Sequence, residues 1–180
     1  SAAARMRRLD ESAEIIMFER GEYISFANCG LPYYIGETIK EREALLVQTP
    51  EDMKARFNID VRVNSDVAGI DVNSKKVTVN SSDRGTYEES YDYIILSPGA
   101  KPIAPPIKGI DSSRIYKLRN VPDTDKIKAV VDSKKITSAV VIGGGFIGIE
   151  TAENLKERGI KVTLVEAAPH ILAPFDTEMA

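Results

Sequence analysis

The chain has 180 residues, of which 43% are hydrophobic and 28% are charged, and its formal net charge is −3. This charge argues against a general electrostatic grip on nucleic acid or on an anionic membrane surface. No apolar run approaches the roughly 20 residues of a membrane-spanning helix, and the first residues lack the apolar segment of a signal peptide. A single cysteine excludes a disulfide framework within this sequence and fits a reducing, cytoplasmic setting.

The start of the chain follows the pattern of half a dinucleotide-binding unit. Residues 2–9 are good helix formers and predict the end of a helix that no capping residue precedes. Residues 13–19 form an apolar run that ends in Glu19, which is typical of a buried parallel strand. Helix, strand and terminal acid form the second half of a βαβ unit, so its first strand and glycine loop are expected upstream of Ser1.

The middle of the chain predicts short helices and an antiparallel sheet. Residues 25–36 predict a turn that leads into a short helix. Residues 49–57 predict a second helix, because a threonine cap, a proline and two acids open it, and a strand is expected at 59–63. From 66 to 96 the apolar residues alternate with period two, which predicts an antiparallel meander. Residues 101–111 are rich in proline and glycine and predict a linker.

A second dinucleotide-binding unit is expected near the end of the chain. In chain order we expect a helix at 123–134, a strand at 139–142, a glycine-rich turn at 143–148, a helix at 149–158 and a strand at 161–166. The turn has the sequence GGGFIG, and its place between a strand and a helix makes the motif more specific than its glycines alone.

Each residue type in this motif has a physical reason. Gly143 permits a tight turn, Gly145 lets the backbone approach a pyrophosphate, and Gly148 lets helix and strand pack closely. The helix N-terminus supplies N–H groups and a positive dipole end for phosphates. Glu166 ends the next strand, where it can accept a hydrogen bond from a ribose 2′-OH and repel a 2′-phosphate, so NADH is favoured over NADPH. Glu19 supports the same argument for a first dinucleotide.

Cys29 is a candidate nucleophile, although a lone cysteine is often a small buried hydrophobe. Gly30 is expected to leave its sulfur accessible, and the helix that follows would stabilise a thiolate at its N-terminus. Because the sequence has one cysteine, an oxidised Cys29 must be a sulfenic acid or a mixed disulfide with an external thiol. Arg5 and Arg8 share one helix face, which could hold phosphates or be a solvated charged face.

These residues resemble the FAD-dependent pyridine nucleotide-disulfide oxidoreductases over essentially the whole chain. The segments that carry the resemblance are SFANCG at 25–30, LSPGA at 96–100, LRN at 118–120, DTD at 123–125 and the turn at 143–150. They are most similar to the single-cysteine branch, which contains coenzyme A-disulfide reductases, NADH peroxidases and NADH oxidases. The SFANC segment and the first helix resemble the reductases more than the peroxidases.

The resemblance implies an α/β fold with two Rossmann-like dinucleotide-binding domains, one for FAD and one for NAD, and an antiparallel β-meander. Both domains are expected to be incomplete in these residues. A partial FAD-binding domain with the redox cysteine and the meander is expected at 1–118. The first half of an NAD(P)H-binding domain is expected at 119–180.

The resemblance also implies roles for individual residues. Cys29 is implied to be the redox-active nucleophile, and no metal site is implied. Positions that match coenzyme A contacts are Ser1, Arg5, Arg8, Ser25 and Asn28. Positions that match FAD contacts are Glu19, Arg20, Ser97, Pro98, Gly99 and Ala100. Positions that match contacts with the nicotinamide dinucleotide are Gly143, Gly145, Phe146, Ile147, Gly148, Glu150, Glu166 and Phe175. A lysine that contacts coenzyme A in some relatives is replaced here by Phe57, with Arg56 beside it.

The implied activity passes electrons from NADH through FAD to Cys29, which reduces coenzyme A disulfide through a mixed disulfide. The full-length protein is expected to be a homodimer with a small-molecule substrate, and these residues alone are expected to be inactive. One alternative is an NADH peroxidase or oxidase that uses a cysteine sulfenic acid. Another is a coenzyme A-dependent persulfide or polysulfide reductase with a rhodanese domain. A third is a non-catalytic dinucleotide-binding module.

Overall fold

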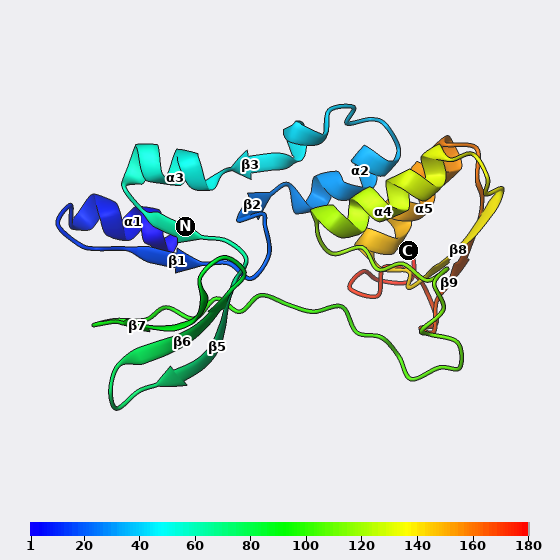
Figure 1. Ribbon diagram of the computed structural model, residues 1–180. Helices are drawn as coiled ribbons and strands as arrows, with labels where there is room; N and C mark the ends of the chain where they lie inside the picture. Colours follow the sequence, from blue (N-terminus) through cyan, green and yellow to red (C-terminus); the bar gives the residue numbers. More distant parts are fainter. Residues whose placement is uncertain (180) are drawn as a thin grey trace. The chain divides into compact units, whose positions relative to one another are not determined.

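A computed structural model describes residues 1–179 as a mixed α/β fold, in agreement with the predicted class (Figure 1). Its contacts divide the chain into two compact units, each built from two separate stretches. Unit 1 comprises residues 1–26 and 46–99, and unit 2 comprises residues 27–45 with the chain from residue 100 onward. The expected domains at 1–118 and 119–180 divide the chain differently and stay a prediction about the larger protein.

Unit 1 contains a parallel strand pair covered by two helices. Its elements are α1 (Ala2–Leu9), β1 (Ile16–Phe18), α3 (Pro50–Phe57) and β4 (Asp60–Arg62). Strands β1 and β4 pair in parallel from Ile16↔Asp60 to Phe18↔Arg62. Ile15, Met53 and Ile59 form the buried core between these elements. Each predicted element is present, but both strands are shorter than expected.

The helix caps of unit 1 decide where its helices begin and end. The expectation that α1 has no cap is wrong, because the Ser1 hydroxyl accepts a hydrogen bond from the amide of Ala4 at 3.4 Å. At α3 the predicted cap is confirmed: Thr49 and Asp52 form a reciprocal capping box. That helix ends where Asn58 adopts a left-handed conformation with φ of 46°.

The antiparallel meander of unit 1 is confirmed as three strands, β5 (Ser65–Asp71), β6 (Lys76–Ser81) and β7 (Gly85–Ser90), in the order β5-β6-β7. Val77 and Val79 of the central strand are buried. The expectation that strand structure extends to residue 96 is wrong. A strand needs a hydrogen-bonded neighbour. The amide of Tyr91 still donates to the carbonyl of Lys75 at 2.9 Å, but no strand within 1–179 pairs with residues 92–96.

A short antiparallel pair in unit 1 was not expected from the sequence. It joins β2 (Ser25–Phe26) to β3 (Leu46–Gln48), and Ser25 is opposite Gln48 in its register. The sequence suggested a turn for residues 25 and 26, because two residues are too few for a period-two pattern to be visible.

Unit 2 packs short and long helices beside a parallel strand pair (Figure 1). Its elements are the 3₁₀ turns η1 (Asn28–Gly30) and η2 (Arg42–Leu45), helices α2 (Leu31–Ile35), α4 (Val121–Asp132) and α5 (Phe146–Glu157), and strands β8 (Ser138–Ile142) and β9 (Lys161–Val165). Helix α2 packs against both α4 and α5. The buried core comprises Ile35, Val131, Leu155 and Ile160.

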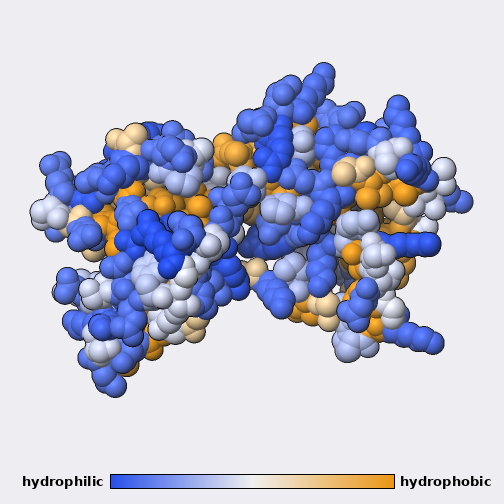
Figure 2. All heavy atoms as spheres, in the orientation of Figure 1, coloured by the Kyte–Doolittle hydropathy of each residue, from blue (hydrophilic) through white to orange (hydrophobic). Residues whose placement is uncertain are grey.

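The second βαβ unit is confirmed as an arrangement of strand, turn, helix and strand. Strands β8 and β9 pair in parallel from Ser138↔Lys161 to Ile142↔Val165. Helix α5 begins at Phe146, three residues before the predicted start at 149, because the last residues of the glycine motif already belong to its first turn. Apolar side chains reach the surface in this region (orange, right side of Figure 2). Val140 and Ile142 of β8 are exposed. None of the helices in the described part of the chain is long and apolar enough to cross a membrane.

Candidate active site

Three of the four glycines in the glycine-rich turn of unit 2 were assigned a role from the sequence, and they have three different environments. Gly143 has a φ of +106°, which side chains disfavour, and its amide donates a hydrogen bond to the carbonyl of Val165 at 2.8 Å. A Cβ at Gly148 would overlap with the carbonyl oxygen of Gly143, so helix and turn touch through their backbones. Gly145 caps α5, and no atom lies within 4 Å of a Cβ built there. The turn therefore has the tight bend, close packing and open approach that a pyrophosphate requires, while binding by these residues stays a prediction.

The Glu166 carboxylate is held by backbone amides on both of its oxygens. Oε2 accepts a hydrogen bond from Gly144 at 2.5 Å, and Oε1 accepts one from Ala168 at 2.7 Å. The N–H groups of Ala168 and Gly144 keep the pKa of Glu166 below its usual range, because they stabilise the ionised form. The acid at the end of β9 is thus a preorganised negative charge.

Gly144, to which the sequence argument gave no role, is enclosed by the chain that follows β9. A Cβ at this position would lie 2.8 Å from Ile171 and 3.1 Å from Glu166 Oε2. Its carbonyl accepts a hydrogen bond from the amide of Leu172 at 2.8 Å. The run of three glycines was the available signal, but the residues that crowd the second one are distant in sequence.

The remaining residues expected along a nicotinamide dinucleotide lie on or near α5. Phe146 and Phe175 form an edge-to-face pair with ring centroids 5.8 Å apart, and both remain partly exposed. Ile147 is exposed on the first turn of the helix. Glu150 lies one turn further along α5 and faces Tyr33. Apolar surface and one acid therefore extend from the glycine turn along the helix.

Cys29 is exposed in the 3₁₀ turn that leads into α2, which argues against a small buried hydrophobe, while its role as a nucleophile stays a prediction. Gly30 does not act as expected: it is buried, and a Cβ there would lie 3.1 Å from Ile39 and 3.2 Å from Leu45. The glycine thus allows the turn to pack closely against Ile39 and Leu45. Helix α2 has five residues, and its effect on the thiolate stays a prediction.

Tyr33 interacts electrostatically both with Cys29 and with acidic residues of α5. The negative charge of Glu150 is the largest cause that raises the pKa of Tyr33, followed by burial and by the charges of Glu153 and Cys29. The Tyr33 hydroxyl also interacts with Glu150 by a hydrogen bond. The structure therefore brings the predicted nucleophile and a residue of the predicted nicotinamide site into one electrostatic environment within unit 2.

Arg119 is a further residue beside the cysteine that the sequence argument did not assign. Its Nη1 donates to Asn28 Oδ1 at 3.2 Å, and its Nε donates to the carbonyl of Ala100 at 3.3 Å. Asn28 was expected to contact coenzyme A, and Ala100 was expected to lie against FAD. Arg119 thus connects a residue expected to contact coenzyme A with one expected to lie against FAD. It is part of the LRN segment at 118–120, which was noted from the sequence.

The residues expected at a first dinucleotide lie mainly in unit 1. Glu19 follows β1, and its Oε1 accepts a hydrogen bond from the amide of Gly21 at 2.7 Å. This is the same relation that Glu166 has with the amide two residues after it. Arg20 is exposed, and Ser97, Pro98 and Gly99 lie in an exposed segment without helix or strand.

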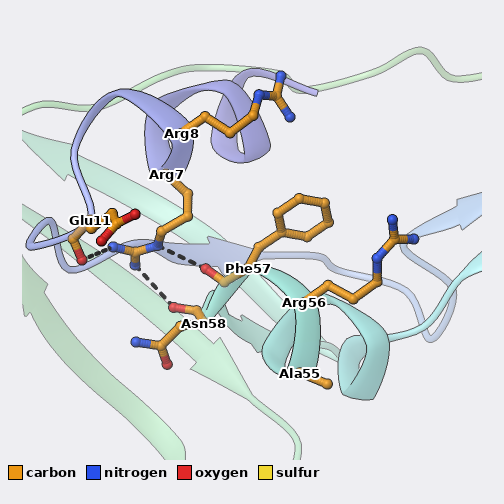
Figure 3. Close-up of a pocket in the computed structure, with 7 residues that line it drawn as sticks. All are labelled: Arg7, Arg8, Glu11, Ala55, Arg56, Phe57 and Asn58. Atoms are coloured by element: carbon orange, nitrogen blue, oxygen red, sulfur yellow. Dashed lines mark hydrogen bonds between the residues drawn. The ribbon is translucent and has the colours of Figure 1, made fainter.

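Three arginines and one aromatic ring surround a pocket of about 430 Å³ between the ends of α1 and α3 (Figure 3). Its lining consists of Arg7, Arg8, Glu11, Ala55, Arg56, Phe57 and Asn58. Arg8 and Arg56 are exposed, and the Arg56 guanidinium lies over the Phe57 ring at 5.4 Å from its centroid. Arg8 was expected to contact coenzyme A, whereas Arg56 was noted from the sequence only as the neighbour of Phe57, and it also lines this pocket.

Arg7 has a different environment from Arg8, because its guanidinium is bound to backbone carbonyls. Nε donates to the carbonyl of Phe57 at 2.8 Å, and Nη2 donates to that of Asn58 at 3.0 Å. Nη1 donates to the carbonyl of Glu11 at 2.7 Å. Arg7 thus joins the ends of α1 and α3 and determines the shape of the pocket wall (Figure 3).

The other residues expected to contact coenzyme A are divided between the two units. Ser1 and Arg5 are on α1, and Ser25 is in β2, all within unit 1. Asn28 and Cys29 belong to unit 2. Within residues 1–179 no group of three or more histidine, cysteine or acidic side chains could hold a metal ion.

Comparisons with a family model and with curated proteins agree on one family. Residues 1–180 match the family described as pyridine nucleotide-disulphide oxidoreductase. A coenzyme A disulfide reductase of Staphylococcus haemolyticus (strain JCSC1435) is 40% identical over 180 residues, which cover 99% of this chain and 40% of that protein. The chain therefore spans about 40% of the length of this curated relative.

Solved structures show the same architecture. The crystal structure of reduced Bacillus anthracis CoADR-RHD has a TM-score of 0.96 and 61% identity, and the match covers 99% of this chain and 32% of that one. An NAD-dependent persulfide reductase from A. fulgidus has a TM-score of 0.94 and 36% identity, with 99% of this chain and 34% of that chain covered.

Proposed function

Because the chain belongs to the pyridine nucleotide-disulphide oxidoreductase family, we propose that it is part of a flavoprotein that passes electrons from NADH through FAD to Cys29. Cys29 then reduces coenzyme A disulfide. The observation that carries this proposal is the exposure of the one cysteine in the turn before α2, in the same unit as the glycine-rich nucleotide turn. Similarity to a coenzyme A disulfide reductase supports the choice of substrate.

The chain's own groups fit both dinucleotides. Open space at Gly145 and the adjoining N-terminus of α5 suit a pyrophosphate, and Glu166, after β9, would accept a hydrogen bond from a ribose hydroxyl. Glu19 offers the corresponding acid for the flavin dinucleotide. The ionised Glu166 would repel a 2′-phosphate, so NADH is preferred over NADPH. When bound, the flavin supplies the two electrons that NADH donates.

Cys29 performs thiol–disulfide exchange in this proposal. Its thiolate attacks one sulfur of coenzyme A disulfide, so that a Cys29–coenzyme A disulfide forms, the substrate S–S bond breaks, and one coenzyme A thiolate leaves and is protonated. Two electrons and a proton then cleave the mixed disulfide, which returns the Cys29 thiolate and releases the second coenzyme A thiol. Each cycle therefore consumes one NADH and one proton and yields two thiols.

The arginine pocket of unit 1 supports recognition of a phosphorylated substrate. Arg8 and Arg56 present two exposed guanidiniums beside the Phe57 ring (Figure 3). Guanidiniums bind phosphate oxygens strongly, and an aromatic face can stack with a nucleobase. Coenzyme A carries both groups. Arg56 thus takes the role that a lysine has in some relatives.

A second candidate, reduction of a coenzyme A persulfide, is favoured by the 36% identity with the persulfide reductase. An exposed thiolate without a partner cysteine in the chain can attack a persulfide sulfur as well as a disulfide sulfur. The homodimeric state and the cytoplasmic location also stay predictions for the full-length protein.

The test is a steady-state assay of the full-length protein with NADH and four oxidants side by side: coenzyme A disulfide, coenzyme A persulfide, hydrogen peroxide and oxygen. We expect the highest kcat/KM with coenzyme A disulfide. Cys29→Ser should lose this activity and retain flavin absorbance. Preference for peroxide or oxygen would instead support the sulfenic acid cycle, and full activity of Cys29→Ser would refute the catalytic role of Cys29.

A further inference from the structure

One face of α5 contacts α2 at three successive levels. Glu150, Asn154 and Arg158 are spaced by four residues, so they lie on the same side of the helix. At the first level Glu150 interacts with the hydroxyl of Tyr33. At the third level Arg158 Nη1 donates a hydrogen bond to the carbonyl of Ile35 at 2.8 Å.

The middle level shows how closely the two helices approach. Asn154 is 2% exposed, and its Nδ2 donates to the carbonyl of Glu150 at 2.8 Å. A Cβ at Gly36 would overlap with the Asn154 side chain. Only a glycine fits here, so the C-terminal end of α2 lies directly on α5 and has no room to move toward it.

Arg158 combines the carbonyl contact with two ion pairs, one of them with Glu37 at 3.5 Å. Its Nη2 lies 2.7 Å from Asp132 Oδ1 on α4, and its side chain is 14% exposed. Lys128 pairs with the same carboxylate at 2.9 Å, and its ammonium lies 5.2 Å from the centre of the Tyr34 ring. The planar guanidinium thus joins α2, α4 and α5, which an ammonium cannot do with the same geometry.

We propose that Arg158 is a positioning residue for Cys29. Helix α2 has five residues, too few to be stable without tertiary contacts. Because Cys29 lies in the turn that runs directly into α2, the contacts that hold the end of this helix also determine where the sulfur lies relative to the glycine turn of α5. This inference rests on the proposed function, since it assigns Arg158 to the reaction of Cys29.

The test compares Arg158→Gln with wild type in the full-length flavin-loaded protein. We expect kcat for coenzyme A disulfide to fall about tenfold or more, as for other residues that orient a reacting group, while KM for NADH changes less than about twofold. Hydrogen exchange in the segment 31–37 should accelerate about tenfold, because the end of α2 opens more often. The rate of Cys29 alkylation by iodoacetamide should change in parallel.

Three further variants separate positioning from general destabilisation. Lys156→Gln, an exposed change on the same helix, should leave every readout within about twofold of wild type. Asp132→Asn removes the ion pair with Asp132 but keeps the bond to Ile35 and the pair with Glu37 at 3.5 Å, so its exchange in 31–37 should rise clearly less than that of Arg158→Gln. Arg158→Lys should recover only part of kcat. Equal effects of Asp132→Asn and Arg158→Gln, or unchanged exchange and alkylation in Arg158→Gln, would overturn the proposal.

Failure of the Arg158 inference can be distinguished from failure of the proposed function. If wild-type protein does not reduce coenzyme A disulfide, the substrate assignment fails, whereas exchange in 31–37 and alkylation of Cys29 still report whether Arg158 holds α2. Accelerated exchange with unchanged alkylation would show that Arg158 stabilises α2 without positioning the sulfur, and would refute the inference.

Discussion

Glu166 and Gly144 are joined by a hydrogen bond of 2.5 Å that connects the end of β9 to the glycine-rich turn before α5. This bond and the one from Ala168 keep the carboxylate ionised, and its pKa lies below the usual range. The acid that is expected to select the dinucleotide is therefore also part of the wall of the turn.

Removal of the Glu166 charge should change the cofactor preference. In Glu166→Ser the repulsion of a 2′-phosphate is lost, so the ratio of kcat/KM for NADH to that for NADPH should fall about tenfold or more. Steady-state assays with both cofactors measure this ratio. Glu157→Gln, an exposed charge change at the end of α5, is the control. An unchanged ratio in Glu166→Ser would contradict the role of this acid.

Two glycines of the same turn should respond differently to alanine. Gly148→Ala places a Cβ against the carbonyl of Gly143 and should destabilise the fold by about 1–3 kcal/mol. Gly145→Ala meets no atom within 4 Å, so its Tm should stay near that of wild type. Because the open space at Gly145 is where a pyrophosphate would lie, this variant should bind NADH more weakly. Thermal unfolding and NADH titration distinguish the two, and a stable, active Gly148→Ala would refute the packing argument.

The neighbouring arginines of α1 should separate stability from substrate binding. Arg7→Gln loses hydrogen bonds to the carbonyls of Phe57 and Asn58 and should lower the free energy of unfolding by about 1–3 kcal/mol. Arg8→Gln should change it by less than about 0.5 kcal/mol, since Arg8 is exposed. KM for coenzyme A disulfide should rise several-fold in Arg8→Gln with little change in kcat. Denaturant unfolding and kinetics test both, and an unaltered KM would remove Arg8 from the substrate site.

Arg62 should be important for the stability of unit 1. Its guanidinium, 14% exposed, bonds to Asp60 at 2.9 Å, to the Tyr87 hydroxyl at 3.1 Å and to Glu89, and lies 5.5 Å from the centre of the Phe18 ring. Arg62→Ala leaves two acids without their cation, at a cost of about 1–3 kcal/mol, because both acids stay partly in water.

The matched control for Arg62 is Arg84→Ala. Arg84 is exposed and lies 3.9 Å from Asp83, so this change should alter the free energy of unfolding by less than about 0.5 kcal/mol. Urea unfolding of Arg62→Ala and Arg84→Ala measures the two changes in the free energy of unfolding. Equal effects of Arg62→Ala and Arg84→Ala would show that the partly buried network of Arg62 contributes no more than a surface ion pair.

Asp132 should contribute to stability above its titration range. Burial raises its pKa, but hydrogen bonds from Arg158 and Lys128 outweigh burial, so the pKa lies below the ordinary 3.8. A depressed folded-state pKa adds stability at pH values above 3.8, and this contribution is lost as the pH falls through the folded-state pKa. Asp132→Asn should therefore lower Tm at pH 7 and lose less Tm than wild type on acidification. Exposed Asp111→Asn is the control, and identical acid limbs for Asp132→Asn and wild type would contradict this linkage.

Local sequence patterns were sufficient to predict the helices, strands and turns that depend only on residues close together in the chain. The capping box at Thr49 and Asp52, the alternating strands of the meander and the glycine turn were all foreseen, because each depends on neighbours in sequence. The strand structure expected to continue to residue 96 ends with β7 at Ser90. An extension would need a neighbouring segment at hydrogen-bonding distance.

The candidate site was predictable only in part. Cys29 and Glu166 were named from sequence because their residue types and positions after known patterns are informative. Arg119 and Arg158 were not, because a surface arginine has no local signature that shows which carbonyl it will bind. Gly30 was expected to leave the Cys29 sulfur accessible, but in the structure a glycine is needed there because Ile39 and Leu45 pack against it. These contacts form only when the chain folds.

The sequence by itself determined the order of elements, because hydrophobic period, caps and glycine spacing are local properties, and the resemblance of its motifs indicated the family and one candidate nucleophile. Only the tertiary structure decided that Gly144 is enclosed and that α2 lies on one face of α5. It also decided that Arg158 binds the carbonyl of Ile35 at the end of α2. These relations join residues far apart in the chain, and their energies depend on distances that exist only once the helices have packed.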